Sequence, residues 1–186
     1  APLPELESLR RSTNDLIFDQ INERGQSRVQ SMLEKGMPDG FYQPTTPQFR
    51  QAMVGVVNEI AARYSHHSSW SGLGLRVGPG SHLYMPDASW GLDPQHLEQF
   101  KKTLGPLDSE VESINPVDCV YGRFREPWVD WRNAQYFKTL QDLENAVTEH
   151  GGSLFLLGLD NFQNVTLTRK LHPSVRGQEY LSLIHI

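Results

Sequence analysis

Two short segments with strand character, residues 71–77 and 153–158, constrain the fold most, because a long helical pattern precedes each of them. The second segment is a continuous apolar run, as expected for a parallel strand that is covered on both faces. In the first segment, apolar side chains alternate with Gly72, Gly74 and Arg76. Strands that alternate with helices of this length indicate βαβ units, so we expect an α/β fold with a parallel sheet.

Helix signals are clear at three places. Thr46 and Pro47 form an N-cap and a first-turn proline, and apolar residues then recur at helical spacing up to Tyr64. Asp93 before Pro94 opens a second helix, and a third begins at Pro127 and ends before the glycine pair at 151–152. We expect residues 105–125 to be irregular, and residues 16–21 and 26–29 to form a hairpin around a turn closed by a glycine.

Composition excludes several classes of function. The net charge of -5 and the scattered basic residues argue against nucleic acid as a partner, since phosphate binding depends on clustered Lys and Arg. No apolar run is long enough to cross a bilayer, so we expect no membrane span. Cys119 is the only cysteine, which rules out an internal disulfide and a cysteine-based metal cage.

The ends of the chain lead to an expectation about its extent. The 186 residues are fewer than the roughly 250 typical of a complete (β/α)8 barrel. We therefore expect residues 1–180 to form a single partial domain, truncated at both ends. The last six residues, 181–186, are typical of a non-native tail, and we leave them out of the functional argument.

Several motifs occur in an order that resembles a known family. Residues 41–47 read Phe-Tyr-Gln-Pro-Thr-Thr-Pro, and a helix that ends in Arg-Tyr precedes Trp-Ser-Gly-Leu-Gly-Leu at residues 70–75. Trp-Gly-Leu-Asp at 90–93 and Trp-Val-Asp-Trp-Arg at 128–132 follow, and then comes the strand at 154–157. This order, over roughly two thirds of the chain, resembles the glycosyl-hydrolase-like barrel proteins of the family 10-like type.

The resemblance implies a partial (β/α)8 TIM barrel that acts on glycosidic bonds of a polysaccharide or glycoconjugate. Such chemistry uses two carboxylic acids, one to protonate the leaving oxygen and one as nucleophile or base. Asp160 directly follows the strand at 153–158, and Asp87 lies in the loop after the strand at 71–77, so both are candidates for the carboxyl-terminal rim. The alternatives are a turn or helix-capping role for Asp160 and a solvated loop position for Asp87.

Other residues near the same rim are candidates for binding a sugar. Arg76 stands where a catalytic carboxylate is expected, and it suits a sugar hydroxyl, an acidic sugar or a structural carboxylate. Aromatic rings can stack on sugar rings or cover helix ends, while acidic residues at a helix start also complement its dipole. The predicted substrate-binding set is Arg76, Tyr84, Trp90, Glu126, Trp128 and Asn161.

We expect neither a metal nor a cofactor. The histidines lack the spacing of metal ligands, and no phosphate-binding glycine loop is present. A non-catalytic carbohydrate-binding barrel is the alternative function, because no clear carboxylate pair stands out in the sequence. The family resemblance implies an extracytoplasmic or secreted protein, and the sequence leaves the oligomeric state open.

Overall fold

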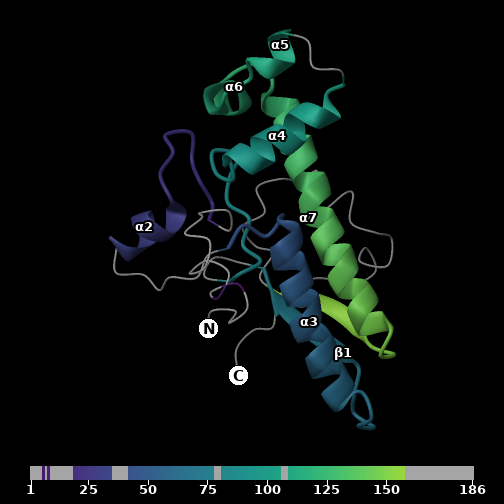
Figure 1. Cartoon of the computed structure of the whole chain (residues 1–186). Coiled ribbons are helices and arrows are strands. Elements are labelled where there is room, and N and C mark those ends of the chain that lie inside the picture. The colour runs from purple at the N-terminus through teal and green to yellow at the C-terminus, as the bar shows by residue number, and fades with distance from the viewer. Residues whose placement is uncertain are drawn as a thin grey trace.

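A computed structural model describes residues 6, 8, 19–34, 42–77, 81–105 and 109–157 of the chain. Its elements are six helices and two strands within these residues (Figure 1). In chain order they are α2 (Arg28–Leu33), α3 (Pro47–Tyr64), β1 (Gly72–Arg76), α4 (Pro94–Thr103), α5 (Ser109–Glu112), α6 (Pro116–Tyr121), α7 (Arg125–Thr148) and β2 (Ser153–Leu157).

The centre of the fold is a parallel pair of strands packed against two long helices. β1 and β2 are hydrogen-bonded neighbours, with Gly72 opposite Ser153 and Arg76 opposite Leu157. Each strand follows a long helix through a short connection, so α3 and α7 run in the same direction and lie side by side (Figure 1). Helices α4, α5 and α6 gather near the amino-terminal end of α7.

Local sequence explains where the helices begin. The Thr46 hydroxyl accepts a hydrogen bond from the amide of Phe49, and Pro47 occupies the first turn, where a missing N–H costs nothing. The Asp93 side chain caps α4 in the same way, with Pro94 after it. Asn115 and Asp118 form a reciprocal capping box at α6. The three caps use the same cap-then-proline signal, and the first two starts were predicted from it.

The apolar face of β1 lies where the alternation predicts. Val77 is buried, and Leu73 and Leu75 pack against the main core cluster between α3, α7 and the sheet. Gly74 and Arg76 on the opposite face are exposed. β2 differs from the expectation of a strand covered on both faces, because its three central residues are only half-buried and its end residues are exposed.

The described residues form an α/β arrangement whose sheet is not closed into a barrel. Its two strands are parallel and alternate with helices, as predicted. Closure of a barrel needs further neighbouring strands on both outer edges, and in the described residues β1 and β2 pair only with each other. The structure therefore supports one part of the barrel prediction, the parallel βαβ unit.

Three boundary predictions were wrong. The second hairpin arm at residues 26–29 is not a strand, because the Ser27 hydroxyl caps α2 and turns the chain into a helix. The turn before it is present, with Gly25 at φ +75 and a single bridge between Ile21 and Ser27. Residues 105–125 contain α5 and α6, and α7 begins at Arg125 rather than at Pro127.

Among the helices of the described residues, none combines the length and the apolar character that a membrane span requires.

Candidate functional site

The loop of residues 81–90, called the site loop below, brings three predicted residues together around Arg28. The Arg28 guanidinium carbon lies 4.6 Å from the centre of the Tyr84 ring and 5.7 Å from the centre of the Trp90 ring. The Asp87 carboxylate acts on the same guanidinium electrostatically. Arg28 begins α2 and is nearly buried, while Tyr84 and Trp90 are half-buried and Asp87 is exposed.

Asp87 is held as an ionised carboxylate. Its Oδ1 accepts hydrogen bonds from the amide and the hydroxyl of Ser89. Partial burial tends to raise the pKa of Asp87, but the Ser89 hydrogen bonds and the charge of Arg132 outweigh this and leave the pKa below its ordinary value. A carboxylate of this kind suits a base or a nucleophile rather than a proton donor.

Helix α7 holds the backbone of the site loop through side-chain donors. The Trp128 indole N–H donates to the Ala88 carbonyl oxygen at 3.1 Å. The Arg132 guanidinium donates to the carbonyl oxygens of Asp87 at 3.1 Å and Pro86 at 3.2 Å. The Tyr136 hydroxyl donates to the Leu83 carbonyl oxygen at 2.8 Å. These three residues are spaced one helical turn apart on α7. Together they donate to four carbonyl oxygens of the loop, those of residues 83, 86, 87 and 88.

Arg132 carries its charge inside the protein. Only 5% of the residue is exposed, and burial lowers the pKa of its guanidinium to about 10, while the Asp87 charge opposes that shift. Gly91 leaves space for this arrangement at the end of the loop. It has φ +80, and a Cβ there would overlap the Gln43 side-chain amide and lie 3.7 Å from Arg132 Nε.

The other predicted binding residues lie apart from this cluster or inside the protein. Trp128 is fully buried and stacks on Trp131, with ring centres 5.3 Å apart, so packing at the helix end accounts for it. Glu126 is exposed in the first turn of α7, where its charge complements the helix dipole. Arg76 is exposed at the carboxyl end of β1. Asp160 and Asn161 lie outside the described residues.

A buried polar network lies beside the site loop. His96 Nδ1 is 2.6 Å from Asp93 Oδ2, and His96 Nε2 is 2.8 Å from Thr45 Oγ1. His96 therefore shares one hydrogen bond with the Asp93 carboxylate through Nδ1 and a second with the Thr45 hydroxyl through Nε2. The three side chains are almost fully buried, and His96 also meets the edge of Trp131. The network joins α4 to the segment before α3, and its burial favours a structural role.

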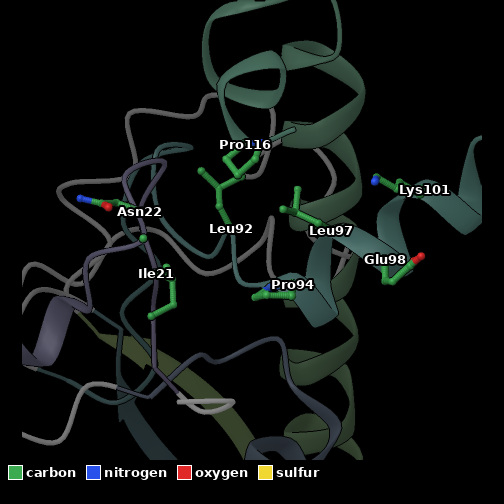
Figure 2. Close-up of a pocket in the computed structure, with 9 residues that line it drawn as sticks. Ile21, Asn22, Leu92, Pro94, Leu97, Glu98, Lys101 and Pro116 are labelled. Atoms are coloured by element: carbon green, nitrogen blue, oxygen red, sulfur yellow. The ribbon is translucent and has the colours of Figure 1, made fainter. Parts of the chain in front are cut away.

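An apolar hollow of about 500 Å³ lies elsewhere, between the turn after residue 21, α4 and the start of α6. Figure 2 shows Leu92, Leu97 and Pro116 gathered around it, with Glu98 and Lys101 extending outward from α4. None of the predicted site residues lines this hollow.

Sequence reasoning missed Arg28 and Arg132. Arg28 was assigned to a strand, and Arg132 was overlooked because it stands among the aromatic residues of an expected apolar helix face. The signal that could have revealed Arg132 is its spacing of one helical turn from Trp128 and from Tyr136. Within the ranges that the structure covers, no group of three or more His, Cys, Asp or Glu is placed to hold a metal ion.

Comparison of the chain with protein-family models, curated proteins and solved structures found no match. The family 10-like resemblance therefore stays a prediction that rests on the sequence motifs, and the geometry of the Arg28 cluster is what the structure adds to it.

Proposed function

We propose that the chain is part of a glycoside-hydrolase-like (β/α)8 barrel that binds a polysaccharide or glycoconjugate at the site loop. The observation that carries the proposal is the cluster of Tyr84, Trp90 and Asp87 around Arg28, in the loop that follows a parallel strand. Ligands of α/β folds bind outside the carboxyl ends of the strands, and this loop comes after β1 in the chain. The partial unit of two parallel strands with neighbouring parallel helices is compatible with such a barrel.

The composition of the cluster fits a sugar. Aromatic rings offer faces for the C–H groups of a pyranose, while arginine and carboxylate groups bind its hydroxyls. Tyr84 and Trp90 are half-buried, so each ring keeps part of its surface open to solvent. Arg28 is already oriented against these rings before any ligand binds, which reduces the entropy lost on binding.

For hydrolysis, Asp87 would act as the ionised base or nucleophile and Asp160 as the proton donor. The lowered pKa of Asp87 supports the first role. The second role rests on the position of Asp160 directly after the apolar strand segment. The alternative is a barrel that binds carbohydrate without cleaving it, and it requires the aromatic cluster but no acid pair.

Calorimetry and product analysis with cellohexaose, xylohexaose, chitohexaose and a galacturonan oligomer test the proposal. We expect binding of at least one of these, strong weakening in Trp90→Ala, and little change in Tyr64→Ala, which removes an exposed aromatic ring that lies on α3 outside the cluster. Loss of cleavage with retained binding in Asp87→Asn and Asp160→Asn supports the hydrolase. Binding without cleavage by the wild type supports the alternative, and no binding to any of the four contradicts the proposal.

A further inference from the structure

We propose that α7 is a positioning helix whose side chains fix the site loop in its binding conformation before ligand arrives, with Arg132 and Tyr136 as the positioning residues. The inference deepens the proposed function and rests on it only for the effect on sugar affinity. Neither residue is among the predicted ligand contacts. Each would act through the backbone of the loop that carries Tyr84, Asp87 and Trp90.

Five carbonyl oxygens of the site loop accept hydrogen bonds from side chains outside the loop. Those of residues 83, 86, 87 and 88 accept hydrogen bonds from α7, and the carbonyl of Tyr84 accepts one from the Gln20 side chain at 3.1 Å. Because a buried carbonyl without a donor is unfavourable, the loop cannot move away without losing several such bonds together.

The donors on α7 are held rigidly themselves. Trp128, Arg132 and Tyr136 are all buried, and the Arg132 guanidinium carbon also lies 5.8 Å from the centre of the Trp128 ring. A guanidinium fork that bridges the carbonyls of Pro86 and Asp87 fixes two consecutive peptide units. Arg132 therefore holds the backbone from which the Asp87 side chain extends, and its charge also stabilises the Asp87 carboxylate.

A matched pair of variants separates positioning from general stability. Tyr136→Phe removes a hydroxyl that donates to Leu83 in the site loop, whereas Thr139→Val removes a hydroxyl that donates at the same distance, 2.8 Å, to Pro44 outside it. Both hydroxyls are buried on the same face of α7. Arg132→Met and Arg132→Lys complete the series, since lysine keeps a donor and the charge while methionine keeps neither.

Hydrogen exchange of the full chain gives a readout that needs no ligand. The amides of Tyr84, Ser89 and Trp90 are bonded inside the loop, so their exchange reports its opening. We expect exchange about tenfold faster in Tyr136→Phe and faster still in Arg132→Met, relative to amides in α3, which serve as the internal reference. In Thr139→Val the exchange rates of the same amides, relative to those of the α3 amides, should equal the wild-type values. Equal acceleration in Thr139→Val, or none in the other two variants, overturns the inference.

Affinity for whichever of the four oligosaccharides the wild type binds is the second readout. We expect Tyr136→Phe to weaken binding by roughly tenfold, Arg132→Met to weaken it more, and Arg132→Lys to restore part of that loss, while Thr139→Val binds as the wild type does. Unchanged affinity in the first two variants contradicts positioning. If the wild type binds none of the sugars, the proposed function fails, and hydrogen exchange still decides whether α7 holds the loop.

Discussion

Replacing His96 by alanine is the sharpest test of the buried network that joins Thr45, Asp93 and His96. The change removes a hydrogen bond to a buried carboxylate, worth about 1.5–3 kcal/mol, and one to a hydroxyl, worth about 1 kcal/mol. It also removes the ring that meets Trp131 edge-on, which adds about 1 kcal/mol. Asp93 keeps its bond to the amide of residue 96, so the helix cap itself survives. We expect a loss of about 3–5 kcal/mol of unfolding free energy.

Urea denaturation followed by tryptophan fluorescence measures this loss. With a slope of about 2 kcal/mol per molar urea, the midpoint should fall by roughly 2 M. His66→Ala is the control, because His66 is exposed after the end of α3, and its loss should cost less than about 0.5 kcal/mol. His96→Asn, which keeps a donor near Asp93, should fall between the two. A midpoint for His96→Ala no lower than that of His66→Ala would show that the network contributes nothing to stability.

Four further substitutions test other parts of the fold. Gly91→Ala should cost about 1–3 kcal/mol in urea denaturation, because of its φ of +80 and the overlap with Gln43, whereas Gly25→Ala, with φ +75 and open space, should cost about 1 kcal/mol. Asp87 has a folded pKa below its ordinary 3.8, so it stabilises the fold above that pH and loses this effect as pH falls through the folded pKa. In Asp87→Asn the urea midpoint should therefore fall less steeply with decreasing pH than it does in the wild type. Burial, with a smaller effect of the Asp118 charge, raises the pKa of Cys119 from 9.0 to about 12, so stability should fall between those values by at most about 1.4 kcal/mol per pH unit, and Cys119→Ala should lack that slope.

The sequence predicts the elements whose signals are local. Thr46 and Asp93 mark the starts of α3 and α4 because a cap followed by proline depends only on neighbouring residues. The parallel pairing of β1 with β2 also follows from the order of strands and helices. The hairpin arm at residues 26–29 failed because Ser27 reads equally well as a strand residue and as a helix cap. The context that decides between them is the burial of Arg28 under Tyr84 and Trp90.

The candidate site could be predicted only in part. Asp87, Tyr84 and Trp90 were placed in one loop by their distance along the chain, and the structure brings them together around Arg28. Arg28 itself was missed, because its contact with the loop joins residues more than 50 positions apart. Trp128 looked suitable for stacking on a sugar because sequence alone does not show which face of a helix end is covered. In the structure its indole N–H is used by the carbonyl of Ala88.

The two halves of α7 differ because they cover different kinds of structure. Toward its carboxyl end the buried face is apolar, with Leu143 and Val147 packed against α3 and the sheet, whose backbone groups already pair with each other. Toward its amino end the helix covers an irregular loop, whose carbonyls have no strand partner and need donors. The buried face there carries Trp128, Arg132 and Tyr136 instead. A hydrophobic pattern favours Ala134 and Phe137 at these turns, yet Ala134 is exposed and Phe137 is half-buried. The buried face of α7 is therefore apolar where it covers the sheet and carries hydrogen-bond donors where it covers the loop. This difference allows one helix to support both.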